Sequence, residues 1–122
     1  MLTSLVLDDE PSIRTLIRAI LSQAGFHTLE AEDGARGLEI MRQSGGAVDL
    51  VVTDIKMPDV DGITFACSVR QSHPRVRIIL VSGYSDGEAS LQFDGFVQKP
   101  FRVNALLEEV HKVMRERINA AA

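Results

Sequence analysis

The sequence alternates between short runs rich in β-branched and other apolar residues and longer segments whose apolar residues recur at helical spacing. The short runs cover residues 2–7, 27–31, 50–53, 77–82 and 95–98. The helical segments cover about residues 11–24, 34–44, 63–72 and 103–118. Strands that alternate with helices predict a parallel sheet with right-handed crossovers and helices on both faces. The chain is therefore expected to be a doubly wound α/β protein with five strands.

Two of the short runs, residues 50–52 and 78–81, are apolar without alternation, as expected for central strands that are buried on both faces. Between the fourth and fifth strands, residues 86–94 suit a helix of only one or two turns, so we expect a shortened or irregular fourth helix. A length of 122 residues fits one domain. We expect this domain to span residues 1–118, followed by a frayed tail at 119–122.

Composition and charge exclude several classes of function. The chain has 13 Lys and Arg against 17 Asp and Glu, a net charge of −4, whereas direct nucleic-acid binding needs clustered positive charge. Its single cysteine, Cys67, allows no internal disulfide, and we expect it to be a small buried residue of the third helix. No apolar run is long enough for a membrane span, and no signal peptide is evident at the N-terminus. These features predict a cytoplasmic domain without membrane insertion.

Polar residues follow four of the five predicted strands. In chain order they are Asp8, Asp9, Glu10, Asp54, Ser82 and Lys99. Parallel strands end at one edge of the sheet, and chemistry in doubly wound folds collects at that edge. We therefore expect acids, a hydroxyl and a lysine to converge there. A dinucleotide site is excluded, because no glycine fingerprint follows the first strand.

The expected cluster of Asp8, Asp9 and Asp54 has a definite chemistry. Packed carboxylates repel one another, so a cation is needed to keep all three ionised. Mg²⁺ suits a site of oxygen ligands that shares positions with water and phosphate. One carboxylate can then attack a phosphoryl donor and become an aspartyl phosphate. Lys99 and Ser82 are groups that would stabilise the charge on the transferred phosphoryl oxygens.

These residues resemble a known family, the receiver domain of two-component response regulators. The matching motifs are Asp8-Asp9-Glu10-Pro11, Asp54-Ile55-Lys56-Met57-Pro58, Asp61-Gly62, Ser82-Gly83 and Lys99-Pro100-Phe101. The resemblance covers about residues 5–113 and implies a flavodoxin-like sheet of strand order 2-1-3-4-5. It also implies a phosphorelay function, in which the domain takes a phosphoryl group from a histidine and is a regulatory phospho-acceptor rather than an enzyme.

The resemblance implies roles for individual residues. Asp54 is expected to be the phosphoacceptor. Asp8 and Asp9, with Asp54 and the backbone carbonyl of Lys56, are expected to hold Mg²⁺.

Three further residues have implied roles. Ser82 and Lys99 are expected to contact the phosphoryl oxygens, with a cis peptide bond between Lys99 and Pro100. Ser82 and Phe96 are expected to be the switch residues that change the surface on phosphorylation. From the residues alone, Phe96 can equally be a plain core side chain.

The family also implies a partner, a histidine kinase or a histidine phosphotransfer domain. Ser82 and Lys99 are 99 − 82 = 17 positions apart, shorter than is usual in receivers and similar to receivers attached to hybrid histidine kinases. The domain is therefore a stand-alone receiver, a part of such a kinase, or a part of a larger regulator. Lys56 and Tyr84 occupy positions at which family members tune the attack of water, and their bulk predicts slow self-dephosphorylation.

Alternative interpretations remain open at this point. A degenerate receiver would act as a scaffold independent of phosphorylation. Residues 59–64 resemble the signature of haloacid-dehalogenase-type phosphatases, although Pro58 separates them from the preceding strand. Asp9 can instead cap the first helix, and Asp59 and Asp61 fit an ordinary turn.

Overall fold

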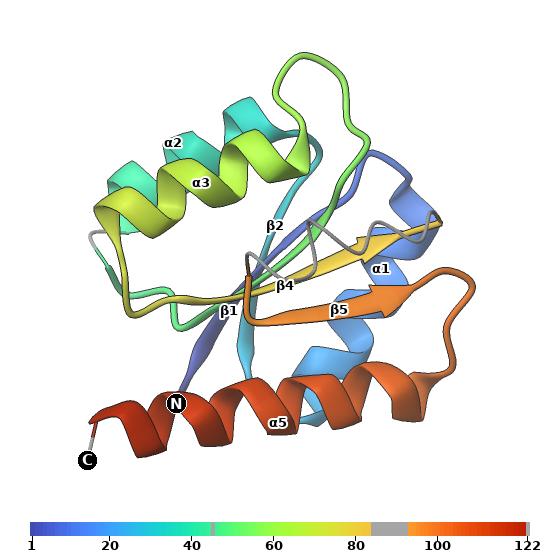
Figure 1. The fold of residues 1–122 in the computed structure, drawn as a ribbon. Helices are drawn as coiled ribbons and strands as arrows, with labels where there is room; N and C mark the ends of the chain where they lie inside the picture. The colour runs from blue at the N-terminus through green and yellow to red at the C-terminus, as the bar shows by residue number, and fades with distance from the viewer. Residues whose placement is uncertain (45, 84–92, 122) are drawn as a thin grey trace.

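The computed structural model describes residues 1–44, 46–83 and 93–121 (Figure 1). The strands are β1 (Thr3–Leu7), β2 (His27–Ala31), β3 (Leu50–Asp54), β4 (Arg77–Ser82) and β5 (Gly95–Gln98). The helices are α1 (Pro11–Gln23), α2 (Gly34–Ser44), α3 (Gly62–Ser72) and α5 (Val103–Ala121). The expected short fourth helix falls on residues 84–92, which lie outside the described residues.

All five strands are parallel and form one sheet of order β2-β1-β3-β4-β5, which confirms the predicted doubly wound fold. The chain crosses from β1 to β2 at one edge and then returns to β3 on the other side of β1. Helices α2 and α3 cover one face of the sheet, and α1 and α5 cover the other (Figure 1). In such an arrangement the strand order reverses beside β1, where polar side chains can gather at the carboxyl edge.

The central strands have apolar side chains on both faces, as their unbroken apolar sequences predict. Along β3, Val51 packs toward α2 and α3, whereas Leu50 and Val52 pack toward α1 and α5. The same alternation runs through β4, where Ile78 and Ile79 face opposite sides and both are fully buried. The sheet is thus fixed between two apolar layers, and only the strand ends are open to chemistry.

Local signals explain where the helices begin. Pro11 is the first residue of α1 and Glu10 is its N-cap, so the interpretation of Asp9 as the helix cap is wrong. Asp61 is the N-cap of α3, where its Oδ1 accepts a hydrogen bond from the backbone N–H of Thr64 at 2.7 Å. This is an ordinary capping role, as expected for a turn acid.

Several sequence expectations need correction in detail. Helix α5 continues to Ala121 instead of ending at Ile118, because the sequence there contains no glycine or proline to stop it. Cys67 is exposed, since the buried face of α3 is formed by Phe65, Ala66 and Val69 and Cys67 points away from it. Among the described residues, no helix is long and apolar enough to cross a membrane. The division into a domain and a frayed tail stays a prediction.

Candidate phospho-acceptor site

The candidate site lies at the carboxyl edge of the sheet. Asp8 directly follows β1, Asp54 is the last residue of β3, Ser82 is the last residue of β4, and Lys99 directly follows β5. Residues of four strands therefore reach the same edge, as the parallel order predicts.

Three carboxylates gather at this edge. One ligand oxygen from each of Asp8, Asp9 and Asp54 lies within 4.8 Å of the others. Within residues 1–44, 46–83 and 93–121, no other group of three or more His, Cys, Asp or Glu side chains comes this close. Asp8 is fully buried and Asp9 is exposed, so the cluster extends from the interior to solvent. A set of oxygen donors that is open on one side fits Mg²⁺, which keeps several of its waters.

Asp8 has hydrogen-bond donors on both carboxylate oxygens. The backbone N–H of Glu10 donates to Oδ1 at 2.9 Å, and Lys99 Nζ donates to Oδ2 at 2.9 Å. A buried carboxylate needs such partners to remain charged. Asp8 is therefore held in one orientation at the base of the cluster.

Asp54 is placed at the edge of the site and is partly buried, with a side chain 12% exposed. Its Oδ1 accepts a hydrogen bond from the backbone N–H of Ile55 at 2.8 Å, and its Oδ2 lies 3.4 Å from Lys99 Nζ. Burial raises the pKa of Asp54 above its ordinary value; Lys99 opposes this rise and the charge of Asp8 adds to it. A second positive charge at the site would relieve this cost.

Lys99 lies between two acids, 2.9 Å from Asp8 and 3.4 Å from Asp54. Burial disfavours its charge, but the two carboxylates outweigh burial and raise the pKa of Lys99 above its ordinary value. The ammonium group is therefore charged at neutral pH. Its backbone N–H donates to the carbonyl of Ser82 at 2.7 Å, and the Lys99–Pro100 bond is cis, as the family resemblance predicts.

Gly62 supports Asp54 from behind, a contact that the sequence analysis missed. A Cβ atom at Gly62 would lie 1.8 Å from the backbone carbonyl oxygen of Asp54. The N–H of Gly62 donates to the carbonyl of Ile55 at 2.8 Å, which draws the start of α3 against the end of β3. Only glycine permits this approach. The Asp61-Gly62 pair was the available signal, but its sequence gives no indication of which backbone it touches.

The other predicted site residues lie nearby with different exposures. Ser82 is 2% exposed at the end of β4, and Lys56 is exposed two residues after Asp54. Phe96 is half-buried in β5, opposite Leu80 of β4. Their contacts with a phosphoryl group or a metal stay predictions.

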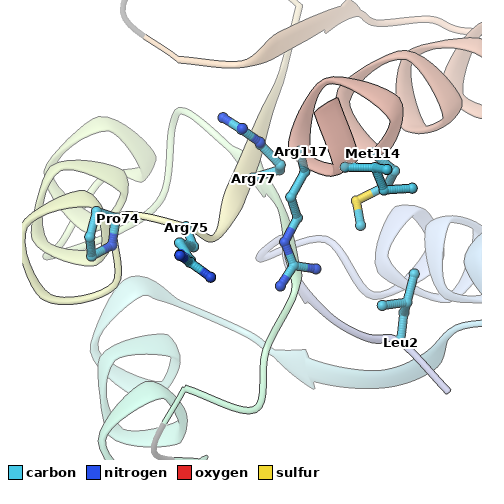
Figure 2. A pocket seen from close by; sticks show the side chains of 7 residues that line it. Leu2, Pro74, Arg75, Arg77, Met114 and Arg117 are labelled. Carbon is cyan, nitrogen blue, oxygen red and sulfur yellow. The ribbon is translucent and has the colours of Figure 1, made fainter. Parts of the chain in front are cut away.

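A cavity of about 460 Å³ lies at the opposite, amino edge of the sheet (Figure 2). Leu2, Arg77 and Arg117 are among the residues that line it. Arg77 and Arg117 are already paired with acids, Asp94 at 3.0 Å and Asp49 at 2.7 Å. None of the predicted site residues lines this cavity, so it is separate from the acidic cluster.

The doubly wound sheet, the acidic cluster and the lysine at its carboxyl edge define a flavodoxin-like regulatory domain. The family described as response regulator receiver domain matches residues 5–111, and the chain belongs to this family. Receiver domains are phospho-accepting regulatory modules of two-component signal transduction, rather than enzymes with a separate substrate. The phosphatase interpretation is therefore wrong. Asp59 lies in the loop after β3 with φ of 65°, and Asp61 caps α3, so neither directly follows a strand.

Individual relatives agree with this membership. Chemotaxis protein CheY of Bacillus subtilis is 35% identical over 118 residues, which cover 90% of this chain and 95% of that protein. Sensor kinase CckA of Brucella abortus is 36% identical over 120 residues, which cover 93% of this chain but only 13% of the kinase. The chain thus corresponds to nearly all of one relative and to a small part of the other.

Solved structures also match. The response regulator TrrA of Thermotoga maritima, in complex with Mg²⁺ and BeF, has a TM-score of 0.82 and 35% identity, covering 93% of this chain and 99% of that one. The receiver domain of the hybrid histidine kinase CckA has a TM-score of 0.79 and 29% identity, covering 92% and 98%. The acidic cluster is of the kind typical of receiver Mg²⁺ sites, and receiver domains work with histidine kinases.

Proposed function

We propose that Asp54 accepts a phosphoryl group from a phosphohistidine of a partner protein. The observation that carries this proposal is the geometry around its carboxylate. Lys99 Nζ lies 3.4 Å from Oδ2, and ligand oxygens of Asp8 and Asp9 lie within 4.8 Å of an Asp54 oxygen. Asp54 is also only partly buried, so an incoming phosphorus can reach it.

In the proposed transfer, a carboxylate oxygen of Asp54 attacks the phosphorus. A P–O bond forms as the P–N bond to the donor imidazole breaks, and the imidazole nitrogen keeps the electron pair and takes a proton from solvent. Lys99 contributes its positive charge to the phosphoryl oxygens, and the Ser82 hydroxyl donates a hydrogen bond to one of them. The products are an aspartyl phosphate and a neutral histidine.

The proposed Mg²⁺ ligands are the carboxylates of Asp8, Asp9 and Asp54 and the backbone carbonyl of Lys56. The ion would supply positive charge next to the phosphoryl oxygens and allow three acids to be ionised together. The donor set fits this role, because every proposed ligand atom is oxygen and one acid of the cluster is exposed.

The proposed switch links Ser82 to Phe96. Once Ser82 turns to the phosphoryl group, we expect the half-buried Phe96 ring to turn inward. The two residues lie on adjacent paired strands, β4 and β5. The surface around β5 would then differ between the two states.

The proposed partner is a histidine kinase or a histidine phosphotransfer domain, in the cytoplasm. An apolar cavity of about 320 Å³ beside Lys99 supports this choice; Ile13, Leu16 and Phe101 line it. Leu16 is 42% exposed there, unlike most large apolar side chains of the molecule. A partner helix that packs on this depression would bring its histidine to the carboxyl edge. The domain would act alone, like CheY, or within a longer hybrid kinase.

The test is intact mass spectrometry after incubation with acetyl phosphate, with and without Mg²⁺, on the wild type and on Asp54→Asn. We expect a Mg²⁺-dependent gain of one phosphoryl group by the wild type and none by the variant. The variant is a matched control, because asparagine keeps the shape of the side chain without its nucleophilic oxygen.

Two results would overturn the proposal. If the wild type gains no phosphoryl group under any condition, the domain is a degenerate receiver that acts as a scaffold. If Asp54→Asn gains one as the wild type does, the phosphoacceptor is another residue.

A further inference from the structure

Arg14 contacts the connection between β1 and α1 in a way that the proposed function does not use. It lies in the second turn of α1, and its side chain is only 20% exposed. Its Nη1 donates a hydrogen bond to the backbone carbonyl of Asp8 at 2.8 Å. That carbonyl belongs to the peptide group that joins Asp8 to Asp9. The guanidinium therefore holds the backbone unit between two acids of the cluster.

The rest of this connection is closed by other hydrogen bonds. The backbone N–H of Arg14 donates to the carbonyl of Glu10 at 3.0 Å, and the N–H of Glu10 donates to Asp8 Oδ1 at 2.9 Å. Only the Asp8–Asp9 peptide carbonyl depends on a long side chain for its partner. Rotation of this peptide group changes ψ of Asp8 and φ of Asp9, and so redirects both carboxylates.

Glu30 of β2 in turn fixes the guanidinium of Arg14. Its Oε1 lies 3.4 Å from Arg14 Nε, and its Oε2 lies 3.1 Å from Arg18 Nη1. Glu30 is paired in register with Val6 of β1, next to the end of the strand that carries Asp8. The contact thus ties α1 and the edge strand β2 to the acidic end of β1. Charge-assisted bonds between partly buried groups are stronger and better oriented than exposed ones.

We propose that Arg14, oriented by Glu30, is a positioning residue that sets the directions of Asp8 and Asp9 and thereby the affinity of the site for Mg²⁺. This inference rests on the proposed function, because it assumes that the acidic cluster holds the cation. Arg14 touches a backbone carbonyl and Glu30, and has no recorded contact with a carboxylate of the cluster. Its effect therefore passes through the backbone.

The test is calorimetric titration of the purified chain with MgCl₂, without any phosphodonor. Calorimetry suits this protein because it contains no tryptophan. We expect Arg14→Gln to weaken Mg²⁺ binding about tenfold, the scale on which partners of metal ligands act. Arg14→Lys keeps the charge but loses the planar fork, so we expect a similar loss. A role of charge alone would leave Arg14→Lys like the wild type and would overturn the inference.

Two controls separate positioning from general stability. Arg36→Gln removes an arginine paired with Glu39 at 3.0 Å on α2, away from the cluster, and is expected to leave Mg²⁺ affinity unchanged. Urea unfolding without Mg²⁺ measures the stability of every variant. If Arg14 were only a structural residue, its variants would lose stability and keep wild-type Mg²⁺ affinity, and that result would overturn the inference.

Glu30→Gln provides a second route if the Arg14 variants do not fold. We expect it to weaken Mg²⁺ binding about threefold, and we expect the double variant with Arg14→Gln to be no worse than Arg14→Gln alone. Simple additivity of the two losses would show that Glu30 does not act through Arg14 and would overturn that part of the inference.

Acetyl phosphate reactions on the same samples distinguish the two proposals. A wild type that is phosphorylated on Asp54, with Arg14 variants that bind Mg²⁺ normally, retains the proposed function and overturns the inference. A wild type that binds Mg²⁺ in an Arg14-dependent way but gains no phosphoryl group does the reverse. A wild type that binds no Mg²⁺ overturns the inference and the proposed cation site together.

Discussion

Lys99 donates a hydrogen bond from Nζ to Oδ2 of Asp8 at 2.9 Å, although the two residues lie 91 positions apart in the sequence. Asp8 is fully buried, so this ammonium group is its main source of positive charge in the metal-free protein. The same contact joins the outer strand β5 to the central strand β1 across the carboxyl edge. Lys99 therefore has two effects, one on the stability of the site and one on its chemistry.

Lys99→Ala is expected to lower both. It leaves the buried Asp8 carboxylate without its counter-charge, which costs about 2–3 kcal/mol in the free energy of unfolding without Mg²⁺. Phosphorylation by acetyl phosphate is expected to slow about 100-fold, because one donor to the developing charge is lost. Urea unfolding and intact mass measure the two effects. Lys112→Ala is the control, since Lys112 forms only a surface pair with Glu109 and should change stability by less than about 0.5 kcal/mol.

Asp54→Asn is expected to stabilise the metal-free protein at neutral pH. The pKa of Asp54 is raised in the folded state, so its protonated form is favoured on folding. Its contribution to stability is therefore present below the ordinary value of 3.8 and is lost as pH rises through the raised folded value. The stability of the wild type relative to Asp54→Asn should fall over that range and then level off. Urea unfolding in EDTA at a series of pH values measures it, and a pH-independent difference would contradict the prediction.

The sequence predicts the fold well because strands and helices have distinct apolar spacing and clear stops. β2, β4 and β5 have the predicted bounds, and the strand order is confirmed. The convergence of Asp8, Asp54 and Lys99 also follows from sequence, since parallel strands end at one edge.

Contacts made by long side chains and by backbone could not be predicted in the same way. The bond from Arg14 to the Asp8 carbonyl depends on a rotamer, and the approach of Gly62 to Asp54 depends on the angle between β3 and α3. Neither leaves a periodic signal in the sequence. Cys67 was misplaced because a small apolar residue fits either face of a helix.

Gly62→Ala is expected to disrupt the site from behind. The added methyl group would overlap the Asp54 carbonyl, so β3 and α3 must separate, at a cost of about 2–3 kcal/mol in the free energy of unfolding. Phosphorylation should fall as well, because the Asp54 backbone moves. Gly83→Ala is the stability control, since a Cβ there meets nothing within 4 Å and should leave the unfolding free energy nearly unchanged. Equal stability of the two variants would argue against the close packing of Gly62.

Slow self-dephosphorylation is expected of the phosphorylated protein. Lys56 is exposed two residues beyond Asp54, and Tyr84 occupies the corresponding position after Ser82, outside the described residues. Their bulk should shield the aspartyl phosphate from water. The loss of phosphoryl mass with time in the isolated protein measures the rate, and Lys56→Ala should accelerate it. A half-life of seconds for the wild type would contradict this expectation.

Leu16→Glu is expected to separate partner docking from phosphoryl chemistry. Leu16 is 42% exposed on α1 and lines the apolar depression beside Lys99. A carboxylate there should weaken packing against a partner helix, so transfer from a phosphorylated histidine phosphotransfer domain should slow about tenfold. Phosphorylation by acetyl phosphate, which needs no such surface, should be unchanged.

Leu2→Glu is the matched control for this experiment. Leu2 has nearly the same exposure, 44%, but it lines the cavity at the amino edge of the sheet, on the far side from Asp54. It should therefore leave both reactions unchanged. If Leu16→Glu slowed both donors alike, its effect would lie in the site itself. If it slowed neither, the partner would dock on another surface, because a buried charge in a packed interface always costs affinity.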